Sequence, residues 1–213
     1  MDVKEAYNNW AEQYDTNANK TRDLEAKALR RSLTGMPFQN CLEIGCGTGK
    51  NTVWLIEKAK HITAVDLSEE MLAKARGKIQ SDKVQFVQAD INRPWAFSGG
   101  NYDLVTFSLV LEHIENLEAV FEKAAAALIG GGYMYIGELH PFKQYTGSKA
   151  RFETENGTQV VTCYNHHVSE FVQSAKKHGF QVADINEYFD EDQGEIPRIL
   201  TLILKKGSPI NAD

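Results

Sequence analysis

The stretch Cys41–Lys50, C-L-E-I-G-C-G-T-G-K, places a glycine-rich turn directly after a short apolar run and before a segment that resembles a helix. Gly45, Gly47 and Gly49 fall at every second position. Residues without a Cβ atom let the backbone turn sharply and let a ligand lie against it. The stretch therefore predicts a strand, a tight loop and a helix that together hold a nucleotide-like cofactor.

The spacing of the third glycine narrows the class of cofactor. A dinucleotide-binding turn reads G-x-G-x-x-G, whereas Lys50 occupies the last of those positions here and the pattern is G-x-G-x-G. Glu43 lies two residues before the first glycine. Its carboxylate would repel a phosphate, and it suits a cationic ligand such as a sulfonium with a free amino group.

The motif resembles E-x-G-x-G-x-G, the first motif of the class I S-adenosylmethionine-dependent methyltransferases. The resemblance implies a Rossmann-like fold and S-adenosylmethionine as the cofactor. It also implies that the loop and the acidic residue before it bind this cofactor, through Glu43, Gly45, Cys46, Gly47 and Gly49.

The bulk properties of the chain limit the other classes of function. It has 213 residues, of which 42% are hydrophobic, as expected for one globular domain. A net charge of -6 argues against a broad nucleic-acid surface, and three cysteines without a C-x-x-C pair argue against a disulfide framework or a zinc site. The apolar runs are strand-sized, and the N-terminus is not a basic region followed by an apolar one. We therefore expect a cytoplasmic protein without membrane insertion, a metal ion or a nucleic-acid partner.

Apolar runs alternate with helical segments along the chain. Each run is followed by a turn signal, which favours a mostly parallel sheet with helices on both faces. The first strand is expected at about 40–45, and the next three are expected to end at Asp66, Asp90 and Ser108. A fifth follows the triple glycine 130–132.

Two strand-like runs, at 180–189 and 198–206, close the chain. The acidic turn between them is too short for a helical crossover, so the two strands should be antiparallel. Helices are expected at about 68–79, 116–128 and 168–178. The predicted fold is α/β, a Rossmann-like, seven-stranded, mostly parallel sheet with a C-terminal antiparallel hairpin. That hairpin is typical of methyltransferases and is not the pattern of Rossmann dehydrogenases.

We expect a single methyltransferase domain over residues 1–213. Its parts would be an N-terminal helical cap at 1–35, a cofactor-binding core at 36–140, a substrate-cover segment at 141–167, and a C-terminal helix and hairpin at 168–213. The third part is the least regular, and its length favours a lid over a plain connection.

Acidic residues follow two neighbouring strands. Asp66 stands where a carboxylate can accept both hydroxyl protons of a ribose. The resemblance implies that Asp90 accepts a hydrogen bond from the adenine amino group and that Ile91 packs on the ring. Leu67 and Met71 would cover its other face, although a core position is an equal alternative for Met71.

Two further segments are expected to meet the cofactor. The resemblance places Ser108 and Leu109, at the end of the fourth strand, beside the methionine part. Tyr7, Trp10 and Tyr14 lie at helical spacing and resemble the opening helix that closes over the cofactor in small-molecule members of the family. Tyr14 is the expected contact, and aromatic packing on the domain is the alternative.

Methyl transfer from a sulfonium is a direct displacement, so the protein mainly aligns the acceptor and the methyl group. No nucleophilic residue is required, but a general base helps when the acceptor is a hydroxyl. His140, just past the fifth strand, is the first candidate, followed by His166 and His167 before the last helix. His113, in a short helical turn, is expected to be structural, and no metal site is expected.

The acceptor cannot be assigned from motifs, but some classes can be set aside. The fourth strand is followed by S-L-V-L and not by the N/D-P-P-Y/F of amino-methylating DNA enzymes. The chain also lacks a Pro-Cys nucleophile and a paired-glutamate loop. Residues 5–140 resemble the small-molecule branch related to quinone-biosynthesis and malonyl-carrier methyltransferases, although L-I-G-G-G replaces the usual basic residue and Pro-Gly-Gly. An NAD(P)-dependent oxidoreductase and a non-catalytic S-adenosylmethionine-binding partner protein remain as alternatives.

Overall fold

The structure is a computed structural model that describes residues 3–148, 150–154, 157–191 and 194–208. Its centre is a seven-stranded sheet of order β3-β2-β1-β4-β5-β9-β8. The first five strands in chain order pair in parallel, whereas β9 pairs antiparallel with both β5 and β8. This topology confirms the predicted fold. The strands are β1 Asn40–Ile44, β2 His61–Asp66, β3 Val84–Gln88, β4 Tyr102–Ser108, β5 Leu128–Leu139, β8 Phe180–Tyr188 and β9 Ile199–Lys206.

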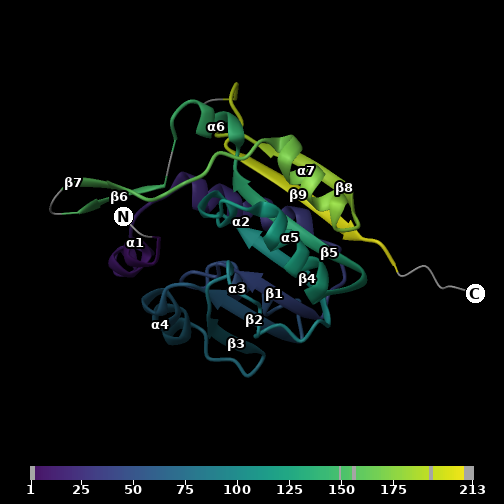
Figure 1. Ribbon diagram of the computed structural model, residues 1–213. Coiled ribbons are helices and arrows are strands. Elements are labelled where there is room, and N and C mark those ends of the chain that lie inside the picture. The colour runs from purple at the N-terminus through teal and green to yellow at the C-terminus, as the bar shows by residue number, and fades with distance from the viewer. Residues whose placement is uncertain (1–2, 149, 155–156, 192–193, 209–213) are drawn as a thin grey trace, which may run out of the picture.

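Helices cover both faces of this sheet (Figure 1). α5 and α7 contact each other on one face, and α2 packs on β5 and β9 on the other. Two hydrophobic clusters result, one around Phe107 and Phe121 and one around Leu29 and Tyr135. The helices are α1 Val3–Trp10, α2 Lys20–Leu33, α3 Thr52–Leu55, α4 Glu69–Lys78, the 3-10 helix η1 Leu111–His113, α5 Leu117–Ala127, α6 Pro141–Tyr145 and α7 Val168–Lys177.

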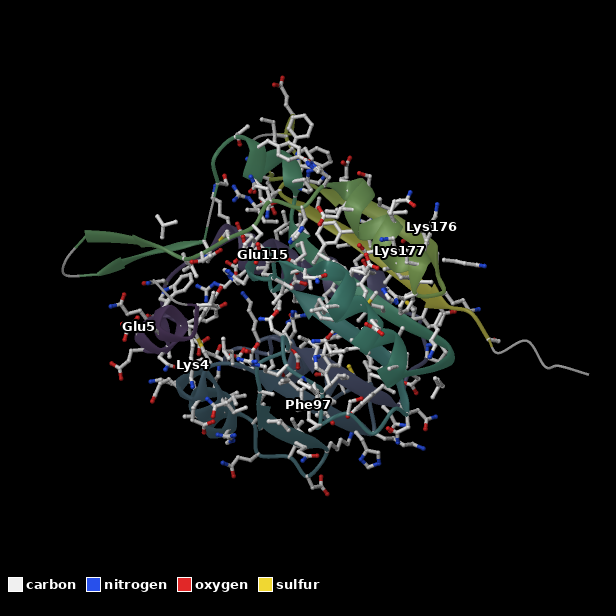
Figure 2. All side chains as sticks on the ribbon, in the orientation of Figure 1. Lys4, Glu5, Phe97, Glu115, Lys176 and Lys177 are labelled. Carbon is white, nitrogen blue, oxygen red and sulfur yellow. The ribbon has the colours of Figure 1, made fainter. Side chains whose placement is uncertain are left out.

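The outer helices follow their amphipathic patterns. α7 buries Phe171 and Ala175 against the sheet, while Lys176 and Lys177 extend outward from its last turn (Figure 2). Cations near a helix C-terminus interact favourably with the helix dipole. No helix in the described ranges is long and apolar enough to cross a membrane.

Two strand boundaries differ from the prediction. β5 begins at Leu128 and therefore includes the triple glycine that was expected to precede it. A register shift in the pairing with β4, between Tyr102 and Leu104, accommodates these glycines within the strand. β3 ends at Gln88, so Asp90 lies two residues beyond the strand and not at its last position.

The segment expected to be irregular, 141–167, contains regular elements. It begins with the short helix α6 and continues into a hairpin of β6, Arg151–Thr154, and β7, Gly157–Val160, which forms a separate sheet. Figure 1 shows this hairpin extending away from the main sheet, on the side of α1. Short strands that pair only with each other leave little periodicity in the sequence, which explains why they were missed.

Candidate active site

A cavity of about 330 Å³ lies at the carboxyl ends of β1, β2 and β4. In open α/β sheets, this edge is where ligands bind. The cavity is lined by nine of the residues predicted to bind the cofactor, namely Tyr14, Gly45, Gly47, Asp66, Leu67, Asp90, Ile91, Ser108 and Leu109.

Asp66 lies in this wall, at the carboxyl end of β2. One carboxylate oxygen, Oδ2, accepts a hydrogen bond of 2.8 Å from the backbone N–H of Gly47, and the other accepts one of 2.9 Å from Ser68. Burial raises the pKa of Asp66, and these backbone bonds lower it. Each oxygen of a carboxylate has two lone pairs. Asp66 can therefore hold the loop and still accept hydrogen bonds from two ligand hydroxyls.

The glycine loop needs its glycines for different reasons. All three have positive φ, +73° at Gly45, +54° at Gly47 and +83° at Gly49, which disfavours residues with a Cβ. A Cβ at the first would lie 1.9 Å from Cγ2 of Val110, on the cavity wall. A Cβ at the third would lie 2.6 Å from Cδ1 of Ile79, behind the wall. Only the first two glycines line the cavity.

Replacing Gly45 with alanine is expected to destabilise the protein by about 1–3 kcal/mol, because the added methyl must displace Val110 from a packed wall. Gly35→Ala is the matched control, since Gly35 has a similar φ of +85° and nothing within 4 Å of its missing Cβ. Urea denaturation of both variants checks this. Equal losses of stability would show that backbone conformation alone, and not the contact with Val110, requires a glycine at position 45.

Four residues predicted to bind the cofactor do not line the cavity. Glu43 is 4% exposed and accepts a hydrogen bond of 2.6 Å from the Thr52 hydroxyl at the start of α3. Burial raises the pKa of Glu43 to about 8. Cys46 is buried in the cluster beneath the loop, and Met71 is fully buried against α1. With Gly49, these residues lie behind the loop and do not line the cavity, so direct contact with the cofactor stays a prediction for all four.

His140, the first predicted base, does not line the cavity. Its Nδ1 accepts a hydrogen bond of 3.1 Å from the backbone N–H of Phe142, so Nε2 carries the proton and faces Glu187 at 2.9 Å. Burial lowers the pKa of His140. Nδ1 thus caps α6, and Nε2 connects the start of this helix to β8.

His166 and His167 also lie outside the cavity. The ring of His166 is buried, with Nε2 2.7 Å from the carbonyl of Ile114 and Nδ1 2.9 Å from Glu170. His167 is the N-cap of α7, and its Nδ1 lies 2.6 Å from the Tyr145 hydroxyl. These contacts connect the start of α7 to the turn after β4 and to α6, so the geometry disfavours either ring as a base.

His113, which was expected to be structural, lines the cavity instead. Its Nδ1 lies 2.8 Å from the carbonyl of Thr162, an acceptor, so Nδ1 donates there and Nε2 accepts from the Tyr7 hydroxyl at 2.9 Å. Burial raises the pKa of Tyr7, which keeps that hydroxyl protonated. Tyr7, from the helix expected to close over the cofactor, also lines the cavity, as do Thr162 and Tyr164. For His113, the available signal was the position of L-E-H, residues 111–113, shortly after the carboxyl end of the fourth strand.

A buried carboxyl holds the turn that carries His113. Oε1 of Glu138, on β5, accepts hydrogen bonds of 3.0 Å and 2.9 Å from the backbone N–H groups of Val110 and Leu111. Burial raises the pKa of Glu138 to about 8. The turn after β4 is therefore fixed by its neighbouring strand.

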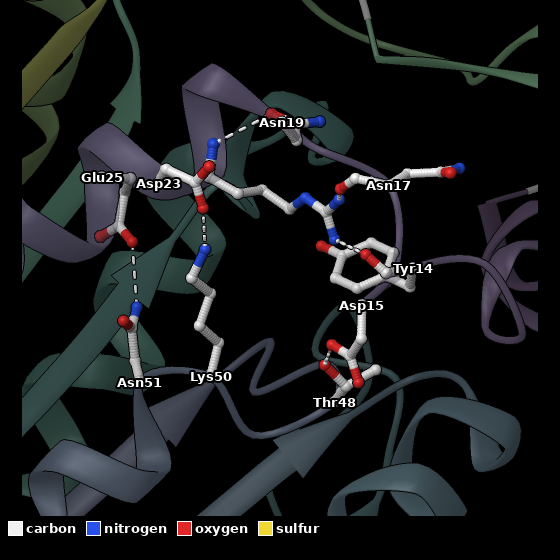
Figure 3. Close-up of polar contacts among 10 residues, drawn as sticks. Tyr14, Asp15, Asn17, Asn19, Asp23, Glu25, Thr48, Lys50 and Asn51 are labelled. Carbon is white, nitrogen blue, oxygen red and sulfur yellow. Dashed lines mark hydrogen bonds and ion pairs between the residues drawn. The ribbon is translucent and has the colours of Figure 1, made fainter.

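The N-terminal segment is bound to the glycine loop (Figure 3). Thr48 donates a hydrogen bond of 2.6 Å to Asp15, and Asn51 donates one of 2.9 Å to Glu25. Lys50 forms an ion pair with Asp23. These contacts hold the start of α2 and the preceding segment against the loop, where Tyr14 closes one side of the cavity. Among the described residues, no cluster of three or more His, Cys, Asp or Glu side chains could hold a metal ion.

Comparisons with known proteins agree with this arrangement. Residues 42–136 match the family model described as a methyltransferase domain. An uncharacterized methyltransferase of Emericella nidulans is 27% identical, with 87% of this chain and 78% of the relative covered. A malonyl-[acyl-carrier protein] O-methyltransferase of Priestia megaterium is 31% identical, with 77% of this chain and 56% of the relative covered. The chain thus spans little more than half the length of that enzyme.

A solved structure of a DhpI–SAH complex has the same fold, with a TM-score of 0.75. It is 24% identical, and the match covers 95% of this chain and 94% of that one. The matched domain begins in β1 and ends in β5, and it contains the whole glycine loop. The chain therefore contains a methyltransferase domain over residues 42–136, and it has the fold of the DhpI–SAH structure.

Proposed function

We propose that this chain transfers the methyl group of S-adenosylmethionine to a small-molecule acceptor by direct displacement. The observation that supports this most is the pair of acids in the cavity. Asp66, at the end of β2, and Asp90, two residues beyond the neighbouring β3, both line it. A ribose and an adenine amino group are the donors that such a pair would recognise.

The cofactor is proposed to lie along the cavity in three parts. Asp66 would accept the ribose hydroxyls, while Asp90, Ile91 and Leu67 would surround the adenine. The methionine part would lie beside Gly45, Ser108 and Leu109, with Tyr14 covering it. When bound, the cofactor supplies an electrophilic methyl group on a sulfonium.

The oxidoreductase alternative has less support. The hairpin of β8 and β9 closes the sheet antiparallel, and the glycine spacing is G-x-G-x-G and not the G-x-G-x-x-G of dinucleotide-binding turns. The names of relatives also favour small acceptors, since they include malonyl-carrier and ubiquinone-biosynthesis O-methyltransferases. The segment 141–167 is proposed to cover the acceptor, because Thr162 and Tyr164 close part of the cavity wall.

The test is a methyl-transfer assay with the purified chain and labelled S-adenosylmethionine. Acceptor panels would contain small alcohols, phenols, amines and carboxylic acids, with duplex DNA and transfer RNA as separate arms. We expect label in members of the small-molecule panel only. Transfer to nucleic acid alone would contradict the proposal, and cofactor binding without transfer to any acceptor would favour the non-catalytic partner protein.

A further inference from the structure

A second cavity, of about 270 Å³, adjoins the first, and the proposed cofactor does not occupy it. The two cavities share Tyr7, Tyr14 and Leu109 as walls. In the proposed function, Leu109 lies beside the methionine part of the cofactor. The second cavity therefore begins where the reactive methyl group is expected. We call it the acceptor cavity.

The acceptor cavity is lined by both apolar and polar side chains. Trp10, Leu109 and Leu139 supply apolar surface, and Glu112 and Arg22 are polar groups that also line it. A pocket of this kind encloses a small molecule and fixes its orientation through a few polar contacts.

Glu112 lines the acceptor cavity and is adjacent in sequence to His113, which lines the first cavity. It is only 7% exposed, and among the described residues its Oε2 has no hydrogen-bond partner. Its Oε1 lies 3.9 Å from Nε2 of His113, which lines the cofactor cavity. Buried carboxylate oxygens are nearly always hydrogen-bonded, because an unsatisfied one is costly. Oε2 is therefore suited to a donor that arrives with a ligand.

Arg22 offers the complementary atom. Its Nη1 donates to the carbonyl of Tyr14 and its Nη2 donates to the carbonyl of Asn17 at 2.9 Å, while the guanidinium lies 3.9 Å from the centre of the Tyr14 ring. Its buried Nε has no partner within the described part of the chain. Arg198, also in the wall, is held by Asp190 through two contacts of 2.6 Å.

We propose that the acceptor cavity holds a small molecule with a hydroxyl or amine at the Glu112 end and an oxygen acceptor at the Arg22 end, and that Glu112 takes the proton during transfer. This inference rests on the proposed function. The acceptor oxygen or nitrogen forms a bond to the methyl carbon, and the sulfur–carbon bond breaks with its electrons left on sulfur. The proton of the acceptor moves to the carboxylate of Glu112.

The same geometry disfavours carboxylates as the methylated group. A carboxylate at that end brings no proton for Oε2, and two like charges would face each other in a site with little water. A carboxylate at the other end of the molecule would instead accept a hydrogen bond from Nε of Arg22. The structure thus favours acceptors that carry a carboxylate at one end and a hydroxyl or an amine at the other. The methyl group would go to the hydroxyl or the amine.

The surroundings of Glu112 suit a proton acceptor. Burial raises its pKa, and His113 and a hydrogen bond from Cys163 lower it. Glu138 and Tyr7 are the other titratable groups that interact with it electrostatically. A raised pKa brings a carboxylate closer to the range in which a general base works well at neutral pH.

The test compares Glu112→Gln with Glu115→Gln, the same chemical change at an exposed position three residues away (Figure 2). The acceptor probes are 4-hydroxybenzoate, 4-aminobenzoate and benzoate, and the cofactor affinity of each variant is measured by titration. We expect turnover of the first two probes only. We also expect Glu112→Gln to lower kcat by about 10² or more, which is the usual contribution of a general base. Its cofactor Kd should stay within about twofold of the unmodified chain.

A pH profile distinguishes proton transfer from a structural role. The kcat of the unmodified chain should rise with pH as Glu112 ionises, and this rise should be absent in Glu112→Gln. Wild-type kcat in that variant, methylation of benzoate alone, or no turnover of any probe would each overturn the inference. A chain that does not bind S-adenosylmethionine would instead overturn the proposed function, so the two failures are distinguishable.

Discussion

Replacing Asp66 with alanine is expected to weaken S-adenosylmethionine binding by about 10²- to 10⁴-fold. The proposed contacts are two hydrogen bonds from ribose hydroxyls to a carboxylate, and bonds to a charged group contribute about 1.5–3 kcal/mol each. The variant also loses the bonds that Gly47 and Ser68 donate to this side chain, which position the loop. Isothermal titration calorimetry measures the change.

A matched variant separates ligand contact from loop support. Asp103, at the opposite end of the sheet, also accepts two backbone hydrogen bonds, from Gln39 at 2.8 Å and Asn40 at 3.0 Å. Asp103→Ala should therefore lose a similar amount of stability and keep its cofactor affinity. Normal cofactor affinity in Asp66→Ala would contradict the ribose assignment. An equal loss of cofactor affinity in both variants would contradict it too.

Replacing Glu43 with glutamine is expected to stabilise the ligand-free protein at alkaline pH. Burial raises the pKa of Glu43 from 4.5 to about 8, so the folded chain binds this proton more tightly than the unfolded chain does. The free energy of unfolding therefore falls as pH rises from about 4.5 to about 8. The loss is at most about 5 kcal/mol for this residue. A neutral glutamine can still accept the hydrogen bond from Thr52.

Urea denaturation at pH 5, 7 and 9 measures this effect. Glu43→Gln should show a smaller loss of stability between pH 5 and 9 than the unmodified chain, and part of the loss should remain because Glu138 also has a pKa near 8. Glu70→Gln, on the exposed side of α4, is the control and should not change the pH dependence. Equal pH dependence in all three proteins would show that Glu43 ionises freely in the folded state.

The sheet could be predicted because its signals are local. The runs that became β1, β2 and β4 are mostly apolar between their first and last residues, as strands buried on both faces are. Ser68 caps α4 through the N–H of Met71, as its position suggested. The antiparallel hairpin of β8 and β9 could be predicted because the turn between these strands is too short for a helical crossover. The hairpin of β6 and β7 has no such signal, because its short strands pair only with each other.

The glycine motif predicted the site but not the direction of each side chain. Gly45 and Gly47 line the cavity, whereas the side chain of Cys46, between them, enters the core. Glu43 lies on a strand buried on both faces, and its hydrogen bond to Thr52 turns it toward α3. Which residues of a tight loop face a ligand depends on elements that pack behind it, such as α4 beneath Gly49.

The histidines show the same limitation more strongly. In the sequence, His140 follows a strand and His167 precedes a helix, so both were expected near the carboxyl edge of the sheet. In the structure, each stands at the start of a helix, where its ring bonds to local groups. His113 reaches the cavity because η1 directs it there and Tyr7 of α1 meets it. A contact between residues 106 positions apart depends on how α1 docks, which the sequence pattern did not reveal.

The most direct test of the account is a calorimetric titration of the purified chain with S-adenosylmethionine, and separately with NAD. The cavity with Asp66, Asp90 and the G-x-G-x-G loop predicts one binding event per chain for S-adenosylmethionine and no heat of binding for NAD. Binding of NAD alone would mean that the cavity accepts a dinucleotide, and it would contradict both the cofactor assignment and the proposed methyl transfer.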